Sequence, residues 1–80
     1  MAQKNRVLRS IETDSGDRCV DIFVRPDGSF GFEEYRRDSE DLRGWFPIGG
    51  YSGTVYSTEI AALDAARAAV PWLTGAINPR

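Results

Sequence analysis

The sequence predicts an α+β fold, in which an antiparallel meander of three to four strands packs on one face against a single C-terminal helix. Two observations predict the meander: apolar-rich runs flank a turn at 26–29, and a similar turn precedes them at 14–16. A third predicts the helix, because residues 59–70 are rich in alanine. Eighty residues allow one domain, and we expect order over about 6–73 with frayed termini at 1–5 and 76–80.

The first strand is expected over residues 6–13, and its register follows from the turn after it. A three-residue turn at 14–16 sets Thr13 opposite Asp17. Counting outward gives the remaining pairs: Glu12 with Arg18, Arg9 with Asp21, Leu8 with Ile22 and Val7 with Phe23. This register contains two opposite-charge pairs and two apolar pairs, both of which stabilise neighbouring strands.

The second and third strands form a hairpin whose turn residues fix the register. Pro26 presets the φ of the first turn position, Asp27 suits the second, and Gly28 can adopt the left-handed conformation that follows. This three-residue loop pairs Val24 with Phe30, Ile22 with Phe32, Val20 with Glu34, Phe23 with Gly31, Asp21 with Glu33 and Cys19 with Tyr35. A two-residue loop would set Ile22 against Glu33, so the three-residue loop gives the cleaner apolar face.

The two faces of the predicted meander differ in composition. The core face is expected to carry Leu8, Val20, Ile22, Val24, Phe30 and Phe32. The opposite face is mixed and carries Val7, Arg9, Ile11, Asp21, Phe23, Glu33 and Tyr35. Antiparallel sheets commonly leave one such face to solvent.

Residues 36–56 give a weaker secondary-structure signal. We expect a charged loop at 36–44, and Pro47 restricts residues 45–48 to an edge strand or an irregular segment. The glycine-rich stretch 44–53 is either a bent connection whose aromatics fill the core or a recognition loop, and the first alternative is favoured. A short fourth strand could form at 54–56.

The helix is expected over 58–70, with Ser57 or Thr58 as its cap. Its apolar stripe is formed by Ile60, Leu63, Ala66 and Val70, widened by Ala62 and Ala69. Pro71 marks the end of the helix, because the residue before a proline avoids helical geometry. Trp72 and Leu73 are expected to fold back over the open edge of the core.

Composition excludes several chemistries. The chain contains no histidine, which excludes catalytic triads and ordinary zinc sites, and the single Cys19 cannot form an internal disulfide. The acidic segment 38–41 lacks the calcium-loop pattern. The row Arg9, Asp21 and Glu33 could hold a catalytic carboxylate pair, but a surface charge ladder is favoured. We therefore expect no enzyme activity, no cofactor and no metal.

The sequence also indicates where the protein works. No apolar run is as long as a membrane span, and the polar N-terminus does not resemble a signal peptide. We expect a small bacterial-type cytoplasmic domain without a membrane partner.

The favoured function is protein interaction, with another protein or with a second copy in a homodimer. A single helix cannot cover both sheet faces, and exposed apolar surface often marks protein contacts. The candidate interaction surface consists of Val7, Ile11, Phe23, Tyr35, Trp45 and Tyr51.

The alternative function is contact with nucleic acid. The predicted topology resembles that of plant ethylene-response DNA-binding domains and phage-integrase arm domains, and the entry Tyr56-Ser57-Thr58-Glu59-Ile60-Ala61-Ala62 is similar to theirs. The same helix entry is also similar to that of small bacterial antitoxin-like domains with a partial ribonuclease-H fold. The resemblance to the DNA-binding domains implies a basic sheet face, from which Asp21 and Glu33 depart, and a net charge of −2 disfavours a polyanion partner. The candidate contacts are Arg25, Arg36, Arg37 and Arg43.

Overall fold

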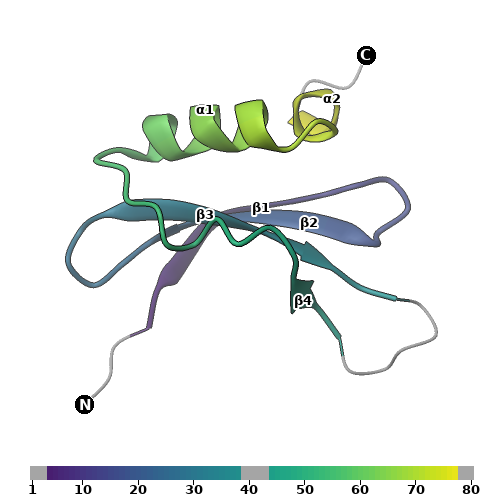
Figure 1. Cartoon of the computed structure of the whole chain (residues 1–80), viewed down its shortest axis with the longest axis horizontal. Coiled ribbons are helices and arrows are strands. Elements are labelled where there is room, and N and C mark those ends of the chain that lie inside the picture. The colour runs from purple at the N-terminus through teal and green to yellow at the C-terminus, as the bar shows by residue number, and fades with distance from the viewer. Residues whose placement is uncertain (1–3, 39–43, 78–80) are drawn as a thin grey trace.

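The computed structural model describes residues 4–38 and 44–77, and these form a four-stranded antiparallel sheet with both helices on one face (Figure 1). The strands are β1 (Arg6–Glu12), β2 (Arg18–Val24), β3 (Phe30–Arg36) and β4 (Phe46–Pro47), arranged in that order across the sheet. The helices are α1 (Glu59–Ala69), which packs on β2 and β3, and α2 (Leu73–Ile77), which reaches β1. The predicted α+β fold class is confirmed.

The β2–β3 hairpin has the predicted register at every pair, from Val24 opposite Phe30 to Cys19 opposite Tyr35. Gly28 adopts a φ of 89°, the left-handed conformation that its position in the turn requires. The turn is held by Asp27, whose Oδ1 accepts the backbone N–H of Ser29 at 2.9 Å.

The predicted register of β1 is wrong over most of the strand. Asp17 joins the turn, where its carboxylate accepts the hydroxyls of Thr13 at 3.0 Å and Ser15 at 2.6 Å. The turn therefore holds four residues, and Thr13 pairs with Arg18 rather than Asp17. The observed pairs are Glu12 with Cys19, Ile11 with Val20, Ser10 with Asp21 and Arg9 with Ile22.

A β-bulge then restores the predicted register at one end of β1. The bulge lies between Val7 and Arg9, so Leu8 is the extra residue and Val7 still pairs with Phe23. The predicted pair of Leu8 with Ile22 does not form. Because a shift of one residue exchanges the faces of a strand, Arg9 and Ile11 lie on the face that α1 covers, which we call the helix face. Ser10 and Glu12 lie on the other side, which we call the open face.

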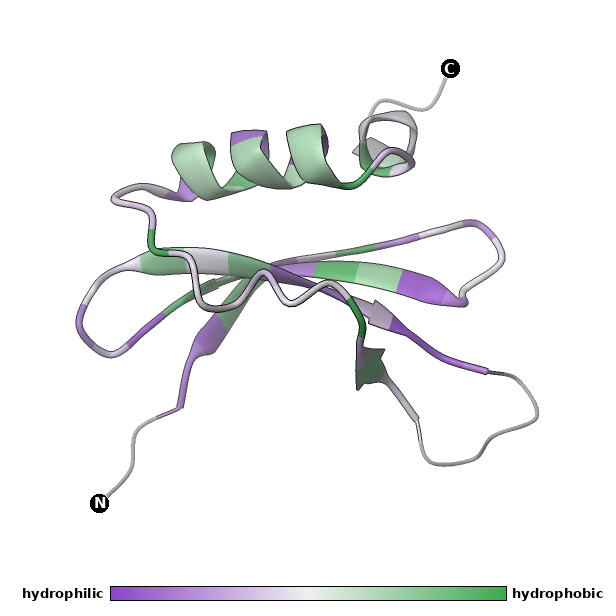
Figure 2. Ribbon diagram, viewed as in Figure 1, coloured by the Kyte–Doolittle hydropathy of each residue, from purple (hydrophilic) through white to green (hydrophobic). Residues whose placement is uncertain are grey.

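The core lies between the helix face and α1, and Figure 2 shows that both layers are rich in apolar residues. It is built from Val20, Ile22, Phe32, Ala62, Ala66, Val70 and Leu73. The small alanines let α1 lie close to the sheet. Ile60, predicted on the apolar stripe, is 72% exposed, because α1 is rotated to present Ala62 and Ala66 to the strands.

Both ends of α1 are specified locally. Thr58 is its N-cap, and the Thr58 hydroxyl accepts the N–H of Ala61 at 3.0 Å. Val70 leaves helical geometry with a ψ of 104°, as expected for a residue before proline. As predicted, the chain then folds back, and Leu73 is fully buried against the core.

The fourth strand differs from the one considered at 54–56. β4 pairs with the end of β3 through Pro47 opposite Tyr35, at the edge of the sheet where a proline is tolerated. The chain then leaves the ladder and rejoins it only at Tyr56, which makes an isolated bridge to Phe30. Neither helix is long and apolar enough to cross a membrane, a statement that covers residues 4–38 and 44–77.

Candidate functional site

The open face has a cavity of about 300 Å³ toward the end of the sheet that carries the β1–β2 turn. β1, β2 and β3 all contribute to it, and the residue before β4 completes its wall. The residues that line this open-face cavity are Ser10, Glu12, Cys19, Asp21, Tyr35 and Trp45. In the described part of the chain both helices lie on the opposite side of the sheet, so the cavity faces outward (Figure 1).

Asp21 organises the floor of the cavity. Its Oδ1 accepts the hydroxyl of Ser10 at 2.8 Å and the thiol of Cys19 at 3.2 Å, and the Ser10 oxygen lies 3.2 Å from the same sulfur. Cys19 itself is only 5% exposed. The observed register of β1 creates this group, because it sets Ser10 directly opposite Asp21.

Two proton-bearing groups in the cavity are held in their neutral form. Burial, with the nearby carboxylates of Asp21 and Glu12, raises the pKa of the Cys19 thiol to about 11. Burial, followed by the charges of Asp21 and Glu33, also raises the pKa of the Tyr35 hydroxyl. At neutral pH the cavity therefore presents a thiol and a phenol, not their anions.

Trp45 is fixed in the cavity wall by a cation–π contact. The guanidinium of Arg37 lies 4.5 Å from the centroid of the indole ring and donates to the backbone oxygen of Gly16 at 2.9 Å. The β1–β2 loop thus fixes the guanidinium of Arg37 by a hydrogen bond, and this guanidinium packs against Trp45.

A second part of the open face is filled by the chain itself. Phe23 was expected to be exposed there, but it is 5% exposed, because Arg25 covers its ring at 5.0 Å and Gly31 lies opposite. Arg25 also donates to the backbone oxygens of Phe30, Ser52 and Thr54. Arg25 therefore fastens the segment after β4 to the sheet.

The buried carboxylate of Glu33 also binds the segment that follows β4. This carboxylate is 2% exposed and accepts three backbone N–H groups, from Glu34 at 3.0 Å, Gly49 at 3.1 Å and Ser52 at 2.9 Å. Two of these donors belong to the segment that leaves the β3–β4 ladder. Glu33 therefore accepts N–H groups that would otherwise bond to a neighbouring strand. The predicted surface row of Arg9, Asp21 and Glu33 does not form, because Glu33 is buried and Arg9 lies on the helix face.

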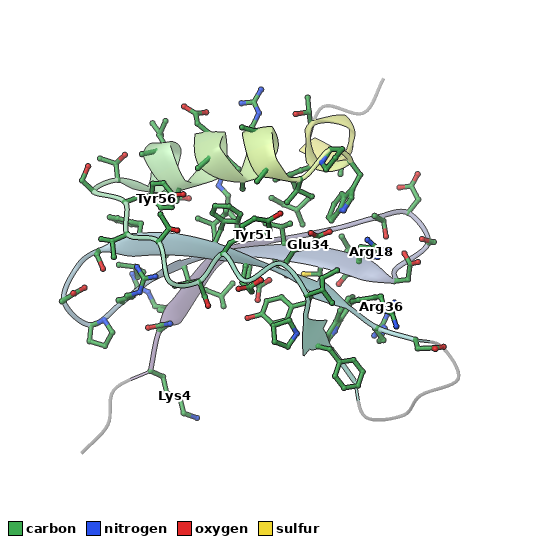
Figure 3. The ribbon with its side chains drawn as sticks, viewed as in Figure 1. Lys4, Arg18, Glu34, Arg36, Tyr51 and Tyr56 are labelled. Atoms are coloured by element: carbon green, nitrogen blue, oxygen red, sulfur yellow. The ribbon has the colours of Figure 1, made fainter. Side chains whose placement is uncertain are left out.

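The predicted interaction surface is divided by the structure. Tyr35 and Trp45 meet in the open-face cavity, and Val7 is 51% exposed on the same face. Ile11 and Tyr51 pack against the core instead, and Tyr51 stacks on Phe32 with ring centroids 4.8 Å apart. Figure 3 shows Tyr51 and Tyr56 between the sheet and α1. The cavity residues Ser10 and Glu12 were missed because the predicted register placed them on the wrong face.

The candidate arginines are also separated. Arg36 and Arg37 lie at one end of β3, where they line a depression of about 490 Å³ with Ser15, Asp17, Arg18 and Asp38. Arg25 lies at the opposite end of the β2–β3 hairpin, and Arg43 lies outside the described residues. Arg18 faces Arg36 across the ladder, and the buried Nε of Arg18 has no hydrogen-bond partner.

In the described ranges no group of three or more His, Cys, Asp or Glu residues is placed to hold a metal ion, and residues 39–41 of the acidic segment lie outside those ranges. No family model matches the chain, and neither a curated protein nor a solved structure matches it.

Proposed function

We propose that this protein is a small cytoplasmic interaction module whose partner docks on the open face of the sheet, at the open-face cavity. The observation that supports this proposal best is an aromatic-walled hollow on the one sheet face that the helices leave uncovered. Tyrosine and tryptophan are enriched among residues that dominate binding energy at protein interfaces. Tyr35 and Trp45 are the anchors of the proposed surface, and Val7 extends it along β1.

Binding fits the cavity better than catalysis does. A nucleophilic cysteine needs a lowered pKa or an adjacent base. The pKa of Cys19 is raised instead, and the chain has no histidine. The thiol then serves as a small buried donor that orients Asp21.

Site-specific photo-crosslinking in cells of the source organism tests the proposal. A photoreactive residue at Val7, exposed on the open face, is compared with one at Ile60, exposed on the outer side of α1. We expect a discrete adduct from position 7 and none of the same mass from position 60. Adding Trp45→Ala should remove that adduct while the protein stays folded by circular dichroism.

The mass of the adduct identifies the kind of partner. An adduct of twice 8.9 kDa indicates a homodimer, which light scattering at low and high salt then checks on the purified protein. Equal adducts from both positions, or none from position 7, would contradict docking on the open face.

A second candidate function is contact with a phosphate backbone at the Arg18, Arg36 and Arg37 depression. Like charges directly opposite in a ladder repel each other, so an anion between Arg18 and Arg36 would reduce that repulsion further, beyond the effect of Glu34, whose carboxylate lies 3.7 Å from the Arg18 guanidinium. The depression also contains Asp17 and Asp38, so this candidate ranks below the first. If replacing Arg36 and Arg37 together by glutamine leaves retention on a nucleic-acid column unchanged, this candidate is excluded.

A further inference from the structure

The charge of the open-face cavity indicates what its occupant carries. Glu12 and Asp21 are its two ionisable carboxylates, and its six lining residues include no lysine or arginine. Arg37 touches the ring of Trp45 but does not line the cavity. A partner group that fills this space therefore meets two carboxylates and, among the described lining residues, no cationic side chain.

The walls of the cavity favour the same kind of occupant. The faces of tryptophan and tyrosine rings attract cations, and guanidinium groups stack on them especially well. The protein already uses this contact twice on the open face, where Arg37 lies over Trp45 and Arg25 lies over Phe23. Aromatic walls above a carboxylate floor are complementary to an organic cation.

The size of the cavity limits the cation to a single group. A volume of about 300 Å³ is at the small end of ligand pockets, which suits one long side chain rather than a cofactor. Arginine presents five N–H donors in a planar fork, so it can bond to two carboxylates while its plane stacks on an aromatic ring. Lysine offers only a compact, strongly hydrated charge.

We propose that the open-face cavity binds an arginine side chain of the docking partner, with Glu12 and Asp21 as its acceptors and Tyr35 and Trp45 as its walls. This inference rests on the proposed function, because it names the group by which the partner is anchored. It assigns the two carboxylates a role in recognition, whereas Glu33 has only a structural role.

Amide NMR of the full chain tests the inference with three capped tripeptides, Gly-Arg-Gly, Gly-Lys-Gly and Gly-citrulline-Gly. Citrulline has the shape of arginine without its charge. We expect the arginine peptide to shift Cys19, Asp21, Tyr35 and the indole N–H of Trp45, and the citrulline peptide to bind at least about tenfold more weakly. The lysine peptide should also bind more weakly than the arginine peptide.

Two variants and a matched control complete the experiment. Asp21→Asn keeps an oxygen that can accept from Ser10 and Cys19, and together with Glu12→Gln it should weaken arginine binding about tenfold or more. Asp64→Asn removes an exposed carboxylate on α1 and should change nothing. The spectra themselves show whether each variant is folded.

The outcomes separate this inference from the proposed function. Equal shifts with arginine and citrulline, equal binding of lysine, or no shift in the cavity would each overturn the arginine assignment. If position 7 still gives a discrete adduct that Trp45→Ala removes, the proposal of docking on the open face stands without the arginine assignment. Arginine binding without any adduct from position 7 would instead leave the cavity assignment intact and contradict the docking proposal.

Discussion

At the scale of single residues, hydrogen-bond partners in the fold determine the burial of a side chain more than its place in the strand pattern does. The alternation of side chains along β3 places Glu33 on the open face, as predicted. The sequence predicts a solvent-exposed carboxylate there, yet Glu33 is almost fully buried. The difference arises because Gly49 and Ser52, sixteen and nineteen residues later, donate their N–H groups to its carboxylate. No local pattern around Glu33 encodes such a long-range contact.

The first prediction concerns this carboxylate. Glu33→Gln replaces one acceptor oxygen by an NH₂ group that faces backbone donors, so buried N–H groups lose their partner. Hydrogen bonds to charged groups contribute about 1.5–3 kcal/mol each, and we expect the free energy of unfolding to fall by about that much. Urea denaturation measures it, with Glu12→Gln as the control, where an exposed carboxylate changes stability by no more than about 0.5 kcal/mol. Similar midpoints for the two variants would show that the N–H groups do not depend on Glu33.

The second prediction follows from the pKa of Cys19, which rises from its ordinary value of 9.0 to about 11 in the folded protein. The folded state then holds the thiol proton more tightly than the unfolded state does. Stability is therefore fully present below about pH 9 and decreases as the pH rises from there to about 11. We expect unfolding in urea to become easier over this range for the wild type than for Cys19→Ala, which has no thiol proton to lose at this position. Parallel pH profiles for the two proteins would refute a buried neutral thiol.

At the scale of elements, turn chemistry decides how much the sequence predicts. The β2–β3 register could be predicted completely, because Pro26, Asp27 and Gly28 each suit one position of one turn. The predicted β1–β2 turn is one residue too short. Asp17 joins the turn through side-chain hydrogen bonds with Thr13 and Ser15, although in the sequence it could equally begin the next strand. That single residue changes which side chains of β1 face the cavity. Tyr35 and Trp45 could therefore be predicted as surface candidates, whereas Ser10 and Glu12 could not.

The third prediction concerns the start of α1, where the sequence left Ser57 and Thr58 as alternatives. Thr58 is the cap, so Thr58→Ala leaves the N–H of Ala61 without its side-chain acceptor. We expect a loss of about 1 kcal/mol in the free energy of unfolding, within the range of about 0.5–2 measured for such caps. Ser57→Ala is the matched control, one residue earlier and equally exposed, and should be close to neutral. An equal loss from both substitutions would show that the helix start is stabilised by the whole turn rather than by one hydroxyl.

At the scale of the whole molecule, the two faces of the sheet differ in structure, and we propose that they also differ in function. The helix face holds the core, with α1 and α2 as its cover, and the open face holds the cavity proposed for binding. Substitutions in Glu12 or Asp21 should therefore change recognition, whereas substitutions between sheet and helices should change folding.

The last prediction tests where the core of this small protein ends. Leu73 is fully buried although it lies beyond the main helix, and Ile60 is 72% exposed although it lies within it. Leu73→Ala should cost about 2–5 kcal/mol, which is a large part of the about 4–12 kcal/mol expected for eighty residues. Ile60→Ala should change stability by no more than about 0.5 kcal/mol and can stabilise α1, since alanine has the higher helix propensity. Urea denaturation of both variants compares the two positions directly.

Because α2 covers one edge of a core that α1 alone does not close, loss of cooperative unfolding in Leu73→Ala would mean that the fold depends on this short helix. A larger loss from Ile60→Ala than from Leu73→Ala would instead place the apolar stripe of α1 where the sequence first predicted it.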